Sequence, residues 1–203
     1  TAGISDMTDA ASHARAVTAQ FGPQASAYVT SAVHARGADL DRLAELLRGN
    51  RTARVLDLGC GGGHVSFTAA PHVAEVVAVD LSADMLAAVT EYAATSGLAN
   101  IRTVQAAVES VHVPPGSFDV VVSRYSAHHW RELVPGLRAA RRALKDGGLA
   151  VFIDVVAPGD PLNDTHLQTV ELLRDRSHVR DRNVDEWETA LVTSGFVVNE
   201  VIA

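Results

Sequence analysis

Two adjacent histidines follow an apolar run in the middle of the chain, where they could take part in acid–base chemistry. The run at residues 118–122 (FDVVV) has the composition of a buried strand, and SRYSAHHW follows directly at residues 123–130. Four interpretations are open for this stretch: a catalytic base, a metal site, a contact to a cofactor, or the start of a helix without chemistry.

The metal interpretation is the weakest of the four. On a helix, the neighbours His128 and His129 point about 100° apart and cannot both face one ion comfortably. The chain has nine histidines and one cysteine, but no Cys–Cys or His–Glu–His spacing typical of a metal site. The sequence therefore predicts no bound metal.

A glycine-rich loop offers a second chemical feature. The apolar run at residues 54–58 leads into DLGCGGGH at 57–64, with glycines at 59, 61 and 63. Glycines permit a tight turn and a close backbone approach to a ligand. Asp80 ends the next apolar run, EVVAVD, where a carboxylate can accept hydrogen bonds from a ribose diol. This order predicts a site for an adenosine-containing cofactor; the alternative is a plain turn followed by a helix cap.

The residues around the glycines help to distinguish between possible adenosine-containing cofactors. The dinucleotide pattern G-x-G-x-x-G requires Gly or Ala at position 64, where this chain has His64. Asp57, two residues before the first glycine, would be poorly placed beside a pyrophosphate but would suit an ammonium group. S-adenosylmethionine carries an ammonium and a sulfonium, so the loop favours it over NAD. An NAD-dependent oxidoreductase remains the alternative enzyme.

Alternating strands and helices must position these loops. Short apolar runs predict strands at 54–58, 75–80, 100–105, 118–123 and 149–156, with helical patterns between them. Such an alternation indicates an α/β fold with a doubly wound, mostly parallel sheet. Helices at 10–21, 24–34 and 39–48 would form an N-terminal helical cap over residues 1–50. Residues 51–203 would form the cofactor-binding domain, with a cap insertion near 160–195.

The C-terminal segment, the net charge and the cysteine count set further expectations. Residues 196–203 have a strand pattern, and we expect more chain beyond them; an unpaired strand there could promote a homodimer. The formal net charge of -7 argues against a nucleic-acid partner. Cys60 is the single cysteine, which suits a reducing cytoplasm. No apolar run approaches the ~20 residues needed to span a bilayer.

Four stretches together resemble a known family. VLDLGCGGG, VVAVDLSADML, FDVVVSRYSAHHW and LKDGGLAVFIDVVAP are similar to the successive motifs of class I S-adenosylmethionine-dependent methyltransferases. The likeness extends from about residue 20 to the end and is greatest to the small-molecule group around the ubiquinone/menaquinone C-methyltransferases. It implies a Rossmann-like fold and methyl transfer to carbon or oxygen of a small aromatic, quinone-like or polyketide-like acceptor. A protein that keeps this fold without catalysing a reaction is the non-enzyme alternative.

The resemblance also implies roles for individual residues. The methionine part of the cofactor would be lined by Asp57, Gly59, Cys60 and Gly61. The ribose and adenine would meet Asp80, Leu81, Met85 and the loop Ala107, Val108 and Glu109. The amino-acid end would contact Ser123 and Arg124 through backbone or side chain. Tyr28 and His34, in the N-terminal helices, could close over the cofactor, and the alternative for both is packing between helices. Many relatives have Asp where this chain has Ala107, so only the backbone could contact the adenine there.

For the histidines, the resemblance separates one candidate from its neighbours. His128 would lie at the carboxyl edge of the sheet and line the methyl-transfer site, so it is the candidate catalytic residue. His178, in the expected cap, is a second candidate. His129 and Trp130 are expected to pack under the following helix.

Overall fold

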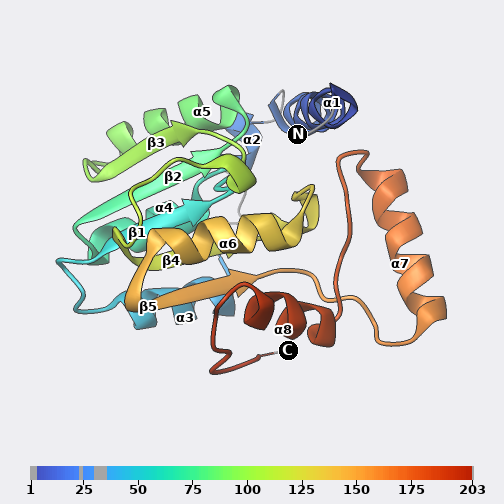
Figure 1. The fold of residues 1–203 in the computed structure, drawn as a ribbon. Helices are drawn as coiled ribbons and strands as arrows, with labels where there is room; N and C mark the ends of the chain where they lie inside the picture. The colour runs from blue at the N-terminus through green and yellow to red at the C-terminus, as the bar shows by residue number, and fades with distance from the viewer. Residues whose placement is uncertain (1–3, 23–24, 30–35, 203) are drawn as a thin grey trace.

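A five-stranded parallel sheet forms the centre of the molecule. The computed structural model describes residues 4–22, 25–29 and 36–202. The strands are β1 (Arg54–Leu58), β2 (Glu75–Asp80), β3 (Ile101–Gln105), β4 (Phe118–Arg124) and β5 (Leu144–Ile153). They lie in the order β3-β2-β1-β4-β5, and every pair is parallel. This confirms the predicted doubly wound α/β fold (Figure 1).

Helices cover both faces of this sheet. Residues Val55, Val76 and Val120 point to the face where α3 (Ala38–Leu47), α4 (His64–Ala69) and α5 (Ala83–Thr95) pack. Leu56, Val77 and Val121 point to the opposite face, which α6 (Leu133–Ala143) and α8 (Val184–Thr193) cover. Successive strand residues point to opposite faces, so strands that are apolar throughout need a helical layer on each side.

The remaining helices stand beyond the ends of the strands. Helices α1 (Ile4–Phe21) and α7 (Pro161–Arg174) lie on the side of the sheet toward which the strands run, and α2 (Ala25–Val29) contacts α5 (Figure 1). Three short 3₁₀ helices are η2 (Ala70–His72), η3 (Val108–Ser110) and η4 (Ala127–His129). No helix in the described ranges has the length and apolar character that a membrane crossing requires.

Three elements differ by several residues from the sequence-based expectations. Helix α1 begins at Ile4 rather than at residue 10, and β5 spans Leu144–Ile153 rather than 149–156. Strand β5 begins early because Leu144 already pairs with Phe118, before a register shift in β4. Helix α2 ends at Val29, and residues 30–35 of the expected second helix lie outside the described residues.

The expected C-terminal strand is wrong for residues 196–202. This segment contains no strand, and no strand of the sheet pairs with it. The side chains of Val197 and Ile202 are 84% and 72% exposed. An apolar alternation stabilises a strand only where a neighbouring strand accepts its backbone hydrogen bonds, and β5 forms the sheet edge without it.

Candidate functional site

A cavity of about 730 Å³ opens at the carboxyl ends of the strands. Its walls come from the loops after β1, β2, β3 and β4, closed from outside by residues of α1 and α7. The strand order reverses between β2-β1 and β1-β4, so the loops after β1 and β4 diverge at this point. Ligands of open parallel sheets bind at such a switch point.

Most of the residues singled out from the sequence line this cavity. The candidate cofactor residues found there are Tyr28, Asp57, Gly59, Cys60, Gly61, Asp80, Leu81, Met85, Ala107, Val108, Glu109 and Arg124. His128 and His178 line it as well. His34 lies outside the described residues. Residues separated by up to 150 positions thus meet in one space, as parallel strands with a common edge require.

Ser123 is not among the residues that line the cavity, and its predicted contact to the cofactor, through backbone or side chain, stays a prediction. Its side chain is buried, and its hydroxyl donates a hydrogen bond to the carbonyl of Leu58 at 2.9 Å. Ser123 belongs to β4 and Leu58 to the neighbouring β1. The hydroxyl therefore stabilises the strand ends that carry the two main loops of the site.

The glycine loop is fixed by hydrogen bonds to the end of β2. The backbone N–H groups of Gly59 and Cys60 both donate to the carbonyl of Val79 at 2.9 Å. The N–H of Gly61 donates to Oδ2 of Asp80 at 2.8 Å, and the N–H of Ser82 donates to Oδ1 at 2.8 Å. Burial raises the pKa of Asp80 despite these bonds. The carboxylate predicted to bind ribose thus also organises the loop beside it.

Asp57 is a buried carboxylate with one unsatisfied oxygen. Its Oδ2 accepts a hydrogen bond from the Ser66 hydroxyl at 2.7 Å, while Oδ1 has no partner among the described residues. Burial, reinforced by the charge of Asp80, raises the pKa of Asp57 to about 7 although the bond to Ser66 opposes this. A buried carboxylate oxygen without a donor is costly, so this position favours a cationic or hydrogen-donating ligand.

Two contacts connect the N-terminal helices to the site. Nε2 of His64 donates to the backbone carbonyl of Tyr28 at 2.8 Å. A Cβ atom on Gly62 would lie 2.9 Å from the carbonyl carbon of Tyr28, so only glycine lets the two segments approach this closely. The histidine that breaks the dinucleotide pattern therefore holds Tyr28 beside the loop.

The exit of β4 makes a sharp turn into the cavity wall. Arg124 donates to Asp39 at 2.5 Å, and its guanidinium lies 4.6 Å from the ring centre of Tyr125. Tyr125 has a φ of 49°, an uncommon conformation for a non-glycine residue. This turn directs the following 3₁₀ helix, η4, across the end of the sheet.

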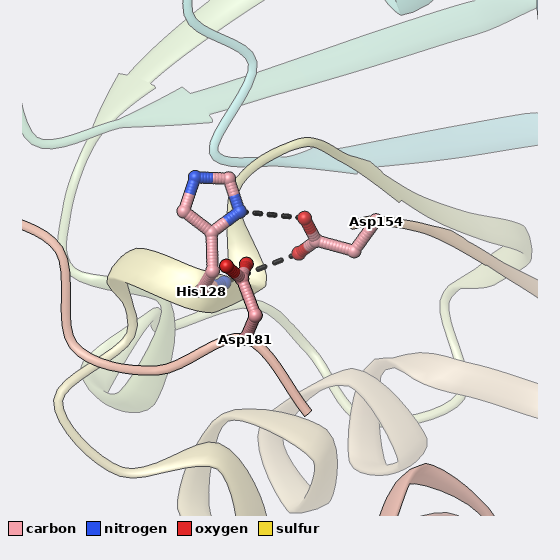
Figure 2. A group of neighbouring side chains, drawn as sticks. All are labelled: His128, Asp154 and Asp181. Carbon is pink, nitrogen blue, oxygen red and sulfur yellow. Dashed lines mark hydrogen bonds and ion pairs between the residues drawn. The ribbon is translucent and has the colours of Figure 1, made fainter. Parts of the chain in front are cut away.

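Helix η4 places the two histidines differently. Nδ1 of His128 lies 2.5 Å from Oδ1 of Asp154, just beyond β5 (Figure 2). The sequence predicted a strand over 149–156, which placed Asp154 inside it. In the structure β5 ends at Ile153, so Asp154 directly follows the strand. An acidic residue near the end of an apolar run is the signal that could have identified it. The ring of His129 lies 4.1 Å from that of His128 and 5.2 Å from that of Phe21.

The expectation that His129 packs under the following helix is wrong, because its ring lies against Phe21 of α1 and His128, and its Nδ1 lies 3.2 Å from the carbonyl oxygen of Ser177. Burial and the neighbouring charge of His128 lower the pKa of His129 to about 4. Trp130 does pack as expected: it is 4% exposed, and its ring lies against α6 at Gly136.

Several cavity residues were not singled out from the sequence. They include His13, Gln20 and Phe21 of α1, and Glu171 and Asp175 at the end of α7. Helix α1 reaches the site through a hydrogen bond from Nε2 of His13 to the carbonyl of His129, at 2.8 Å. Sequence periodicity identifies such helices but does not indicate which end of the sheet they cover.

Three side chains near η4 have the donor types of a metal site. One potential ligand atom from each of His128, Asp154 and Asp181 lies within 4.8 Å of the other two (Figure 2). The three residues come from three separate loops, so their spacing in the sequence gave no such signal. Nδ1 of His128 already shares a hydrogen bond with Asp154.

Comparison with known proteins agrees with this geometry. A family model described as a methyltransferase domain matches residues 55–148. The uncharacterized methyltransferase YcgJ of Bacillus subtilis is 34% identical over 181 residues, which cover 89% of this chain and 72% of YcgJ.

The chain belongs to the class I methyltransferases.

Other known proteins share its sequence or fold. The uncharacterized protein YafE of Escherichia coli is 45% identical over 144 residues, covering 71% of this methyltransferase and 70% of YafE. The crystal structure of YcgJ superposes with a TM-score of 0.74 over 77% of this chain and 67% of that one, at 33% identity. A phosphoethanolamine N-methyltransferase of Haemonchus contortus, solved with S-adenosylhomocysteine, has a TM-score of 0.68 and 26% identity over 78% of this chain and 37% of its own.

Proposed function

We propose that this methyltransferase uses S-adenosylmethionine to methylate carbon or oxygen of a small aromatic, quinone-like or polyketide-like acceptor. The single observation that carries the proposal is the pair of carboxylates at the glycine loop. Asp57 presents an unpartnered buried oxygen, and Asp80 lies one strand away with its carboxylate on the same cavity. An ammonium and a ribose diol are the groups that such a pair would bind.

The residues around the loop fit this cofactor. Asp57 could receive its ammonium group, Asp80 its ribose hydroxyls, and the buried side chain of Met85 would pack against its ring systems. S-adenosylmethionine supplies an electrophilic methyl group on a sulfonium. The protein's contribution is then to orient the acceptor, exclude water and hold a proton where the acceptor must lose one.

An aromatic acceptor suits the part of the cavity away from the glycine loop. The aromatic residues Phe21, Tyr125, His128, His129 and Trp130 are all among the residues that line it. Aromatic side chains in a cavity wall favour binding of planar molecules. We propose that the N-terminal helices and the segment near 160–195 act as caps over this part.

Two alternatives stay open to experiment. An NAD-dependent oxidoreductase would place a pyrophosphate beside Asp57, which is unfavourable while that carboxyl is ionised. A non-catalytic protein would bind the cofactor without turnover. We further propose a cytoplasmic location, because Cys60 is the single cysteine of the sequence. The homodimer through residues 196–203 stays a prediction.

Isothermal titration of the wild-type chain with S-adenosylhomocysteine and with NAD tests the proposal. We expect binding of S-adenosylhomocysteine and none of NAD. Asp80→Ala should weaken binding about tenfold or more, since a hydrogen bond to a charged group contributes about 1.5–3 kcal/mol. Asp146→Ala, at a fully exposed position far from the cavity, is the matched control. Binding of NAD alone would contradict the proposal. Binding of S-adenosylhomocysteine without methylation of any member of a phenol and quinol panel would favour the non-catalytic protein.

A further inference from the structure

Three hydrogen bonds reach the carboxylate of Asp154, two from His128 and one from Val155. Oδ1 lies 2.5 Å from Nδ1 of His128, and Oδ2 accepts the backbone N–H of the same residue at 3.1 Å. Oδ1 also accepts the N–H of Val155 at 2.9 Å. The Asp154 side chain is only 4% exposed. An ionised carboxylate can only accept, so Nδ1 of His128 must be the donor in this pair.

We propose that Asp154 is a positioning residue that keeps the proton of neutral His128 on Nδ1, so that Nε2 is the base that takes a proton from a phenol or enol acceptor. Nε2 lies on the side of the ring away from Asp154 (Figure 2). It makes no hydrogen bond to the described residues, and the ring borders the cavity. This inference rests on the proposed function and narrows its acceptor class.

The proton balance requires an acceptor with a hydroxyl proton that Nε2 of His128 can take. Nε2 takes the hydroxyl proton, and the oxygen keeps the electron pair that forms its bond to the methyl carbon. For an enol that is methylated on carbon, the oxygen pair forms the carbonyl double bond, and the pair of the former C=C bond forms the bond from the far alkene carbon to the methyl carbon. The bond between methyl and sulfur breaks with its pair left on sulfur, and His128 later releases its proton to water. A phenol or enol is more acidic than an aliphatic alcohol, so its proton is the better matched to an imidazole base.

Other charged groups surround the imidazole. Those facing it are Asp154, Asp181, His129, His178, Glu171 and Asp175. Burial alone would disfavour a charged His128, but the hydrogen bond and charge of Asp154, with the acids beyond it, raise its pKa above the ordinary value of 6.5. Burial lowers the pKa of His178, and the charge of His128 lowers it further. His128 is thus the histidine of this group suited to accept a proton near neutral pH.

A divalent cation held by His128, Asp154 and Asp181 is the competing use of the same atoms. It would have to separate Nδ1 of His128 from Asp154, whose carboxylate already accepts two backbone N–H groups. Burial raises the pKa of Asp181, which favours its protonated form over a metal-binding carboxylate. These contacts favour the positioning role.

Long-range ¹H–¹⁵N spectra of the cofactor-free protein test the proposal without any turnover. We expect His128 to carry its neutral-state proton on Nδ1 and to titrate above pH 6.5. In Asp154→Asn the amide can donate to Nδ1, so the proton should move to Nε2 and the pKa of His128 should fall. Asp146→Asn, at an exposed aspartate, should leave both unchanged. A proton on Nε2 in the wild type would overturn the proposal, and this measurement needs no variant.

Kinetics with a phenol that the wild type methylates give the second readout. Asp154→Asn should lower kcat about 10²–10⁴-fold with little change in KM, and move the acidic limb of the pH–rate profile to lower pH. Undiminished kcat would overturn the proposal. If the wild type and Asp154→Asn both bind S-adenosylhomocysteine, an undiminished kcat contradicts only the role of Asp154 and leaves the proposed function intact. Loss of activity after chelation, restored by Mg²⁺ or Mn²⁺, would assign the three residues to a cation instead.

Discussion

Gly59 and Ser126 face each other so closely that a Cβ atom on Gly59 would lie 1.8 Å from the Ser126 hydroxyl oxygen. The two residues belong to the loops after β1 and β4, which bound the cavity. Gly59 also has a φ of +70°, in the left-handed region that favours glycine. Its requirement for glycine thus comes both from its own backbone and from a contact 67 positions away.

Replacing Gly59 with Ala should therefore damage both stability and cofactor binding. A strained backbone and a displaced Ser126 side chain together cost about 2–3 kcal/mol, which corresponds to a fall of roughly 5–10 °C in Tm. Binding of S-adenosylhomocysteine should weaken by about tenfold or more. Thermal unfolding and calorimetric titration measure the two effects.

Two further variants separate the causes in Gly59→Ala. Gly159→Ala, where no atom lies within 4 Å of the new Cβ, should leave Tm unchanged. Adding Ser126→Gly to Gly59→Ala should restore the stability lost through the overlap of the new Cβ with the Ser126 side chain. It should not restore the stability lost through the positive φ at position 59. An unchanged Tm in Gly59→Ala alone would contradict the close contact.

Asp57 should make the protein less stable as pH rises from about 4 to about 7. Its folded-state pKa is raised to about 7, whereas the unfolded carboxyl titrates near 3.8. Between these values the folded state binds more protons than the unfolded state, so the free energy of unfolding falls with rising pH, by at most about 1.4 kcal/mol per pH unit. Above pH 7 both states are ionised and this contribution no longer changes.

Asp57→Asn removes this titration while an amide oxygen can still accept from Ser66. Urea unfolding at pH 5 and pH 7.5 should show a smaller decrease in stability for the variant than for the wild type. Asp146→Asn, at an exposed position, should follow the wild type. Identical pH dependence of the Asp57→Asn variant and the wild type would mean that the carboxyl titrates normally.

Gly136 should be required inside α6 even though glycine weakens helices. A Cβ atom there would lie 2.6 Å from Cε3 of the buried Trp130 ring. Alanine gains about 1 kcal/mol in helix propensity, but overpacking a buried ring costs about 1–3 kcal/mol. We expect Gly136→Ala to lower the free energy of unfolding by about 1 kcal/mol. In a double-mutant cycle with Trp130→Phe, the penalty should disappear; an increase in stability in the Trp130 background would contradict the contact.

Arg180 should hold α7 to α8 without contributing much to global stability. Its Nη2 donates to Asp164 of α7 at 3.0 Å and to Glu186 of α8 at 3.1 Å. These groups are partly exposed, so each pair contributes at most about 1 kcal/mol. Arg180→Ala should therefore leave Tm nearly unchanged but accelerate amide hydrogen exchange in α7, which buries no residue. Arg42→Ala removes surface ion pairs to Glu45 of α3 and to Glu200, away from α7 and α8, and is the control; equal exchange in both variants would rule out this role.

The parallel sheet could be predicted because its signal is local. Each strand is a short apolar run beside a loop, and only a sheet covered on both faces can bury residues such as Leu56 and Val76 together. The C-terminal segment could not be predicted in the same way. Its alternation resembles a strand, but pairing depends on a neighbour that the pattern does not contain.

The sequence by itself determined the alternation of strands and helices, the glycine loop and the two acids at the strand ends, because these depend on backbone requirements and hydrophobic period. The tertiary structure alone decided which histidine has a carboxylate partner. His128 and Asp154 are 26 positions apart, on the loops after β4 and β5. They meet because those strands are neighbours in register, a relation that no local pattern records.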